Sequence, residues 1–412
     1  MRVASVVPVT TYSAVRTTGI YCRPGCGAKP LAENVRTFEL PAAAEAAGYR
    51  ACLRCRPYRI VGTVPDAAPE LVCRAVQLII AGLLDDDGEA ALGARLGLSV
   101  RQLRRLFHEH LGATPDQFAR SRRAHFARRL LDDTELGIAE VAFASGFGSL
   151  RQFNRAMREI FRASPRELRD RRRRGDRLAA DGGLVLRLPF TPPYDWDTMC
   201  TFLADRAIPG VESVEDGVYR RVISLDGEPG MLEIGPGGDD HLLLRAHLPF
   251  WEGVIHVADR AARLVGVDHD PMIARGQSAP VFGPEVAARP GLRVPGAWAP
   301  FEVAVQAVLR DRLPPADATD ALHKLVEVHG TPVPGLTHGL THAFPAPEAL
   351  TSAHLIGTLA TEVADGNIML EPAAGLVRSL ETVTSPPAAQ EIALRLGDHS
   401  PAAVRQWLVS VT

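Results

Sequence analysis

Residues 138–168 read IAEVAFASGFGSLRQFNRAMREIFRASPREL, and this stretch decides the fold of the central part of the chain. Apolar residues recur at intervals of three and four, which predicts short amphipathic helices. Gly146 and Gly148 mark a turn, and Ser149 is a typical N-cap for the helix that follows. A helix, a tight turn and a second, arginine-bearing helix together predict a helix-turn-helix unit.

An upstream stretch repeats this plan. Residues 89–112, EAALGARLGLSVRQLRRLFHEHLG, place an alanine-rich helix and a turn at Gly97 before an N-cap at Ser99 and another basic helix. Helical periodicity continues to about residue 173, so we expect an all-α domain with tandem helix-turn-helix units over residues 70–175. Its core is predicted to contain Leu103, Leu106, Phe107, Phe147, Phe153 and Met157.

The second unit resembles the AraC-type transcription factors, through the run from Gly146 to Arg158 and the later Ser164-Pro165. This resemblance implies two recognition helices that enter successive major grooves about 34 Å apart. Arginine and glutamine can read guanine and adenine edges, and phosphate contact or plain exposure is the alternative for each candidate. The candidates are Arg101, Gln102 and Arg105 in the first helix and Arg151, Gln152 and Arg155 in the second.

The charge of the chain is divided unevenly. The net charge is only −2, yet residues 101–177 carry 19 Lys and Arg against 10 Asp and Glu. Residues 178–412 carry 16 against 29. The imbalance favours double-stranded DNA as the partner of the central region and makes the remainder a poor match for a polyanion. Nearly all the basic charge is arginine, which suits phosphate contacts but also reflects GC-rich coding.

Four of the six cysteines form a spaced cluster: Cys22 and Cys26, then Cys52 and Cys55. In a reducing compartment, such short pairs favour a tetrahedral Zn²⁺ site over disulfides. The spacing alone leaves open whether this site is purely structural or reactive. The other two cysteines, Cys73 and Cys200, are expected to be buried small apolar residues. We place this domain, a small α+β fold, at residues 1–62, before a linker that reads TVPDAAP.

Residues 14–57, AVRTTGIYCRPGCGAKPLAENVRTFELPAAAEAAGYRACLRCRP, resemble the N-terminal domain of Ada-type methylphosphotriester methyltransferases. The resemblance implies that all four cysteines bind zinc and that Cys22 is also the nucleophile that removes a methyl group from the DNA backbone. Transfer is then stoichiometric, because no regenerating chemistry is apparent. The family's N-terminal helix has no counterpart here, which we expect to weaken the domain. Candidate phosphate contacts, with simple solvation as the alternative, are Arg16, Thr17, Arg23 and Arg54.

From residue 184 onward, strand-like segments precede helices. Residues 186–212 and 293–309 resemble the AlkA-type DNA glycosylases of the helix-hairpin-helix superfamily. This implies an α+β body over residues 184–412, with an N-terminal antiparallel sheet followed by a helical bundle.

The parts of this body that would excise a base do not match the family. The family's glycine-rich hairpin, which lets backbone N–H groups approach a phosphate, is replaced at residues 380–389 by LETVTSPPAA. Asp398 is the carboxylate left near the family's catalytic position, and it is better explained as an exposed residue at a helix start. With the acidic charge of this region, we predict that base excision has been lost.

These observations predict a multidomain regulator of the adaptive response to alkylation. It would transfer a backbone methyl group to Cys22 and then activate repair genes together with RNA polymerase. No apolar run approaches the roughly 18 residues of a membrane span, so we expect no membrane contact and a cytoplasmic, nucleoid-associated protein. Two alternatives stay open. One is a bifunctional regulator with active DNA-3-methyladenine glycosylase, and the other is a zinc-stabilised AraC-type regulator without methyl transfer.

Overall fold

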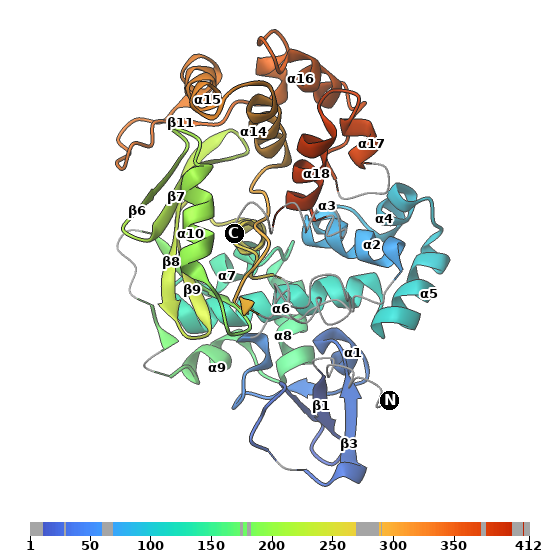
Figure 1. Cartoon of the computed structure of the whole chain (residues 1–412). Helices are drawn as coiled ribbons and strands as arrows, with labels where there is room; N and C mark the ends of the chain where they lie inside the picture. Colours follow the sequence, from blue (N-terminus) through green and yellow to red (C-terminus); the bar gives the residue numbers. More distant parts are fainter. Residues whose placement is uncertain are drawn as a thin grey trace. The chain divides into compact units, whose positions relative to one another are not determined.

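The computed structural model describes residues 11–28, 30–59, 69–173, 176–178, 183–268, 288–289, 291–371, 376–397 and 407. The chain divides into two compact units (Figure 1). The first contains Met1–Ala179 and Phe250–Asp259, and the second contains Ala180–Pro249 and Arg260–Thr412. The predicted multidomain α+β, all-α and α+β organisation is confirmed.

A small four-stranded sheet begins the first unit, with strand order β3-β1-β2-β4. Its central pair is antiparallel, and β4 runs parallel to β2. The short helix α1 begins with Pro41, a position where the missing N–H is not needed for the helix. Buried Tyr12 and Ala14 alternate with half-buried neighbours, as expected for a sheet with one packed face. The elements are β1 Tyr12–Val15, β2 Ile20–Cys22, η1 Ala32–Asn34, β3 Val35–Phe38, α1 Pro41–Ala46, β4 Arg50–Ala51 and η2 Pro57–Arg59.

Among the described residues that follow in the first unit, eight helices are present from α2 to α9, as expected for the predicted all-α fold of this region. They are α2 Glu70–Ile80, α3 Leu83–Asp86, α4 Glu89–Leu96, α5 Val100–Leu111, α6 Pro115–Asp133, α7 Ile138–Ala144, α8 Leu150–Phe161 and α9 Pro165–Asp170. The predicted N-caps are confirmed, because Ser99 and Ser149 each accept a hydrogen bond from the backbone three residues ahead. Helix α6 lies at the centre and contacts α2, α5, α7, α8 and α9.

The core of the first helix-turn-helix unit also includes the zinc-binding part of the chain. Leu40, Ala42 and Ala43 of the α1 region belong to the same buried cluster as Leu103 and Phe107. The predicted core residues are confirmed as buried, except that Leu106 is only half-buried against this cluster. The two parts therefore share apolar burial, which is the largest stabilising contribution in folding.

A five-stranded antiparallel sheet opens the second unit, in the order β5-β9-β8-β7-β6. Its strands are β5 Leu184–Pro189, β6 Glu212–Glu215, β7 Val218–Leu225, β8 Glu228–Gly238 and β9 His241–His247. Strands β5, β7, β8 and β9 match the strand-like segments of the sequence, and β6 has no such segment. The segments are LVLRLPF, GVYRRVISLD, GMLEIGP and HLLLRAHLP. Helix α10 (Trp196–Asp205) connects β5 to β6 and packs against β6 and β7. Helix α11 (Val254–Leu264), which was not predicted, begins in the first unit and ends in the second.

The rest of the second unit is mostly helical and is built around α14, whose buried face lies in one large apolar cluster. Its elements are α14 Pro300–Arg312, α15 Pro315–His329, β10 Thr331–Pro332, β11 His342–Ala343, η4 Pro347–Leu350, α16 Gly357–Ala364, α17 Leu376–Leu380 and α18 Pro386–Arg395. The apolar periodicity of residues 402–411, AAVRQWLVSV, predicts a further helix, which falls outside the described residues apart from Trp407. Within the described part of the chain, we find no helix with the length and apolar character needed to cross a membrane.

Candidate functional site

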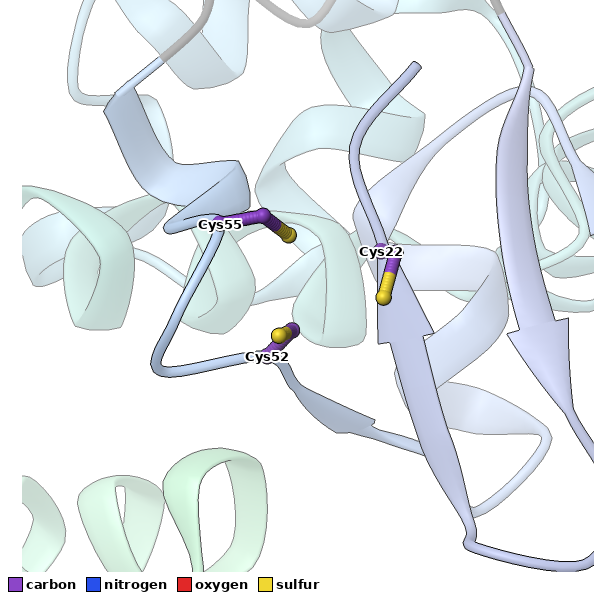
Figure 2. Close-up of side chains that lie close together, drawn as sticks. All are labelled: Cys22, Cys52 and Cys55. Atoms are coloured by element: carbon purple, nitrogen blue, oxygen red, sulfur yellow. The ribbon is translucent and has the colours of Figure 1, made fainter. Parts of the chain in front are cut away.

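Three thiols converge at one edge of the small sheet. The Sγ atoms of Cys22, Cys52 and Cys55 all lie within 4.8 Å of one another. Figure 2 shows that Cys22 comes from the end of β2, while Cys52 and Cys55 come from the loop after β4. The structure thus brings together three of the four predicted ligands, although Cys22 and Cys55 are 33 positions apart in the sequence.

Backbone hydrogen bonds hold these cysteines in place. The N–H of Cys52 donates to the carbonyl of Tyr21 at 3.0 Å, which ties the second cysteine pair to the strand that ends in Cys22. The N–H of Arg56 donates to the carbonyl of Cys52, also at 3.0 Å, and closes the turn that contains Cys55. Because both contacts use the main chain, the convergence of the thiols follows from strand pairing and turn geometry.

The thiols fit a divalent metal ion. Burial raises the pKa of the Cys22 thiol, and the neighbouring thiol groups of Cys55, Cys52 and Cys26 raise it further. Burial also raises the pKa of Cys55, to about 11; a hydrogen bond from the backbone of Arg23 opposes this rise, and the thiols of Cys52 and Cys26 add to it. Crowded thiolates therefore repel one another, and a bound cation would remove that penalty. Soft sulfur donors in a tetrahedral set are the ligands that zinc prefers, so the cofactor is zinc.

Cys26 lies close to this group, but its Sγ atom is not within 4.8 Å of all three of the other Sγ atoms. A hydrogen bond from the backbone of Ala28 lowers the pKa of Cys26, as do the thiols of Cys22 and Cys55. Its role as the fourth ligand stays a prediction. Of the remaining cysteines, Cys200 is buried as predicted, but Cys73 is only half-buried because it lies beside the buried face of α2.

The four predicted phosphate contacts fall into two pairs. One pair neighbours the cysteines in the sequence, and the other lies further from them. Arg23 directly follows Cys22, and Arg54 is exposed on the loop between Cys52 and Cys55. Arg16 and Thr17 are exposed in the turn at the other end of β2. They therefore lie at the opposite end of this strand from Cys22, and their role as phosphate contacts stays a prediction.

All six candidate base contacts on α5 and α8 are exposed. Two of their side chains also have partners within the chain. The Oε1 atom of Gln102 accepts hydrogen bonds from the backbone N–H and the hydroxyl of Ser99, which completes a capping box. The Nε of Arg155 donates to Glu159 at 2.7 Å. Arg101 and Arg151 hold equivalent positions, one residue after the start of each recognition helix.

A buried polar cluster next to Cys22 was missed by sequence reasoning. The hydroxyl of Tyr21 donates to Glu45 at 2.6 Å, and Nε2 of His125 lies 2.7 Å from the same carboxylate oxygen. Tyr21 belongs to β2, Glu45 to α1 and His125 to α6. The cluster thus joins the strand that carries Cys22 to the central helix of the DNA-binding region. The sequence shows a tyrosine directly before Cys22, but the residues that its hydroxyl contacts lie up to 104 positions away.

In the second unit, residues 380–389, which stand in place of the family's glycine-rich hairpin, still form a hairpin between α17 and α18. The amides of Thr382, Val383 and Thr384 donate to carbonyls in the last turn of α17, so they are occupied within the hairpin. The hydroxyl of Ser385 caps α18 and donates to Asp311 at 2.5 Å. A carboxylate therefore stands at the helix N-terminus where an anion would be expected to bind. Asp398 lies outside the described residues.

A half-buried carboxylate in this unit, that of Glu302, is already paired. Both oxygens of Glu302 accept hydrogen bonds from one nitrogen of Arg221, at 2.9 and 2.7 Å. Burial raises the pKa of Glu302, and the charge of Arg221 opposes this. Arg221 also contacts Glu212 and lies over the ring of Trp298. These contacts identify Glu302 as part of a structural ion-pair network.

Comparison with known proteins divides the chain in the same order. The metal-binding domain of Ada matches residues 10–58, a helix-turn-helix domain matches residues 92–171, and the AlkA N-terminal domain matches residues 185–299.

Individual relatives cover different shares of the chain. A probable bifunctional transcriptional activator/DNA repair enzyme AlkA from Mycobacterium tuberculosis is 36% identical over 410 residues, which cover 93% of this chain and 82% of the relative. DNA-3-methyladenine glycosylase 2 of Escherichia coli is 32% identical over 40% of this chain and 57% of its own length. The bifunctional transcriptional activator/DNA repair enzyme Ada of Escherichia coli is 34% identical over 29% of this chain and 32% of its own length.

Proposed function

Because the chain belongs to the family of bifunctional transcriptional activator/DNA repair enzymes in which an Ada-type metal-binding domain and a helix-turn-helix domain precede an AlkA-type domain, we propose that it is an alkylation-response regulator. It accepts a methyl group from a DNA methylphosphotriester and thereby activates repair genes together with RNA polymerase. A thiol cluster that must stay reduced favours action in the cytoplasm, on the nucleoid. The observation that carries the proposal is the convergence of three thiols, with half-buried Arg23 and exposed Arg54 beside them in the sequence.

The proposed reaction uses the sulfur of Cys22. Cys22, Cys26, Cys52 and Cys55 would hold zinc, which keeps cysteines as thiolates at neutral pH. The Cys22 thiolate attacks the methyl carbon, the bond from that carbon to the ester oxygen breaks, and the electron pair stays on the phosphate. The products are S-methylcysteine and an ordinary phosphodiester. Arg23 and Arg54 hold the phosphate as it gains its charge, by charge-assisted hydrogen bonds.

Methyl transfer also changes how the protein meets DNA. Four thiolates around a divalent cation have a formal charge of −2, because each ligand contributes −1. Methylation of one sulfur raises this to −1 and weakens the repulsion of the DNA backbone. Helix α1 shares a core with α5, and the cluster of Tyr21, Glu45 and His125 joins β2 to α6. These contacts support a single DNA-binding unit. In this unit, the methylated site adds to the DNA affinity that the two recognition helices provide.

Base reading by the recognition helices is tested by replacing one arginine in each. We expect Arg101→Ala and Arg151→Ala each to weaken binding about 10-fold to 100-fold, since a bidentate base contact is worth about 1–3 kcal/mol. The measurement is fluorescence anisotropy at constant salt, with a duplex that the wild-type chain selects from a random library. Arg245→Ala is the matched control, an exposed arginine on β9 of the other unit. An equal loss on unselected DNA would instead identify a phosphate contact.

We propose further that the AlkA-type part no longer excises bases. Its hairpin amides are occupied and Asp311 stands at the start of α18, so a DNA phosphate meets a like charge there. The acidic composition of residues 178–412 also opposes the duplex bending that base extrusion needs.

Loss of base excision is checked with the full chain and DNA that contains 3-methyladenine. We expect no abasic sites above background, while DNA-3-methyladenine glycosylase 2 of Escherichia coli serves as the active control. Accumulation of abasic sites would establish the bifunctional alternative. Asp398→Asn and Glu302→Gln would then show which carboxylate is responsible, and the pairing of Glu302 with Arg221 predicts that it is not Glu302.

A further inference from the structure

A buried network of charges lies directly behind the second cysteine pair. Arg56 follows Cys55, and its guanidinium lies 2.6 Å from Asp176 and 3.8 Å from Asp132. Both carboxylates come from the DNA-binding region, more than 70 residues further along the chain. We propose that Asp176 is a positioning residue for the zinc centre, which acts through Arg56 to hold the turn that carries Cys52 and Cys55. The inference rests on the proposed function only in taking these cysteines as zinc ligands.

The backbone of Arg56 is part of the turn itself. Its N–H closes the turn on the carbonyl of Cys52 at 3.0 Å. Its φ is +54°, in the left-handed region that residues other than glycine rarely adopt. A residue keeps this conformation when its surroundings compensate for the cost. The side-chain anchor of Arg56 is therefore placed where it stabilises an otherwise unfavourable turn.

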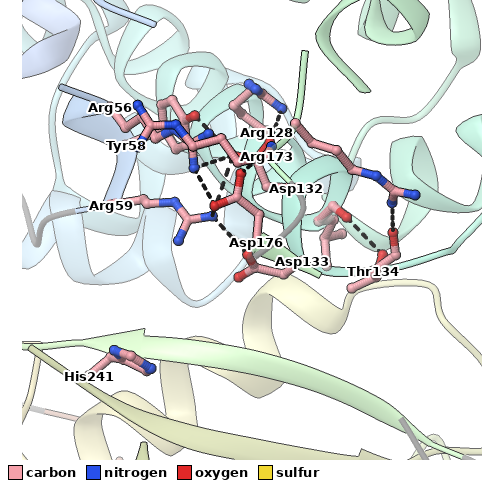
Figure 3. A network of polar contacts seen from close by, with 12 residues as sticks. Arg56, Tyr58, Arg59, Arg128, Asp132, Asp133, Thr134, Arg173, Asp176 and His241 are labelled. Carbon is pink, nitrogen blue, oxygen red and sulfur yellow. Dashed lines mark hydrogen bonds and ion pairs between the residues drawn. The ribbon is translucent and has the colours of Figure 1, made fainter. Parts of the chain in front are cut away.

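The anchor belongs to a network of polar contacts (Figure 3), in which Arg56, Asp132 and Asp176 are buried and Arg59 is partly exposed. Asp132 is fully buried, accepts a hydrogen bond from Tyr58 at 2.9 Å and pairs with Arg128 at 2.6 Å. Arg59, two residues after the proline that follows Arg56, pairs with Asp133 at 3.0 Å. The segment after the last cysteine is thus held on the end of α6 by several ion pairs.

Asp176 is well suited to hold Arg56. Burial opposes its ionisation, but hydrogen bonds from Arg56 and from the backbone of Arg173 outweigh this and lower the pKa of Asp176 to about 2. The carboxylate is therefore charged over the whole neutral range. Charge-assisted hydrogen bonds of this kind are shorter and stronger than neutral ones, which suits a contact that fixes one geometry.

The test measures the rate at which the full chain releases zinc to a chromophoric chelator. Partners behind metal ligands typically change metal affinity by about 10-fold to 100-fold, so we expect Asp176→Ala to release zinc about tenfold faster. Asp176→Asn, which keeps an acceptor for Arg56, should show a smaller increase. Glu135→Ala is the matched control, because Glu135 pairs with Arg172 and Arg177 in the same region but not with Arg56. Its rate should equal that of the wild type.

The route through Arg56 is tested with Arg56→Gln alone and combined with Asp176→Ala. The double variant should release zinc no faster than Arg56→Gln, because both changes remove the same contact. Additive rates would show that Asp176 acts by another route. An unchanged rate in Asp176→Ala, or an increase seen only together with loss of the helical circular dichroism signal, would overturn the positioning role. Zinc release needs no methyl transfer, so failure of the proposed reaction leaves this test intact.

Discussion

Cys22→Ser is expected to abolish methyl uptake completely. When the wild-type zinc protein is mixed with an oligonucleotide that contains a methylphosphotriester, its intact mass should rise by one methyl group per chain. The serine variant should show no increase, because an uncharged hydroxyl is far less nucleophilic than a thiolate. Cys73→Ser is the matched control, a cysteine on α2 outside the thiol group, and should be methylated like the wild type.

Peptide mapping identifies the acceptor among the four cysteines. This matters because Cys22 is only 7% exposed, whereas Cys26, Cys52 and Cys55 are half-buried. A methyl group found on one of these three would reassign the nucleophile while keeping the reaction. An unmodified wild-type chain, under conditions in which the DNA is bound, would instead support the zinc-stabilised regulator that transfers no methyl group.

The same samples report on the switch in DNA affinity. The methylated wild type should bind its selected duplex about tenfold more tightly than the unmethylated protein, an order-of-magnitude expectation for removing one repelled charge near phosphates. The difference should shrink as salt is raised, because screening weakens the repulsion. Cys22→Ser should show no rise after treatment with the methylphosphotriester, and because it lacks one thiolate charge, its affinity before treatment should already lie near that of the methylated wild type.

Phe107→Ala is expected to destabilise the first unit by about 3–5 kcal/mol, the range for a large aromatic removed from a packed core. Phe107 is fully buried and packs edge-to-face on Phe118, with ring centroids 6.5 Å apart. Because Leu40 and Ala43 of the zinc-binding part lie in the same apolar cluster, zinc retention should fail together with the helices. Urea unfolding followed in parallel by circular dichroism and zinc release checks both expectations.

The control for this variant is Phe143→Ala, which truncates a phenylalanine that is 38% exposed. Surface changes usually stay within about 0.5 kcal/mol, so its midpoint should hardly move. Phe107→Ala could shift the helical transition and leave zinc release unchanged. The zinc-binding part would then unfold independently, and the shared core would not couple its stability to that of the helices.

Much of the architecture could be predicted because its signals are local. Ser99 and Ser149 cap the recognition helices where the turn glycines indicate, since a helix start needs only a nearby oxygen acceptor. Four of the five described strands of the larger sheet, all except β6, follow apolar runs bounded by glycine and proline. Cysteine pairs at short spacing likewise indicate a metal site before any tertiary contact is known.

Other features of the site could not be predicted, because their partners are remote in sequence. Glu45 and His125 are 80 residues apart, and Arg56 and Asp176 are 120 apart. Neither pair has a distinguishing spacing, and an arginine or aspartate in a charged helix is usually solvated. Helix α11 was also missed, as was the pairing of Gln102 with Ser99, which gives a candidate base contact a second, structural role.

The sequence by itself determined the order of the parts, the zinc-binding cysteines as a group, the two recognition helices and the loss of the glycine-rich hairpin. The first three follow from periodicity, spacing and residue type, which act over a few residues, and the last follows from the resemblance to the AlkA-type glycosylases. Only the tertiary structure decided that α1 shares a core with the first helix-turn-helix unit and that Asp176 stands behind the turn of Cys52 and Cys55. Burial and ion pairing depend on which distant segments meet, and that is settled when the whole unit folds.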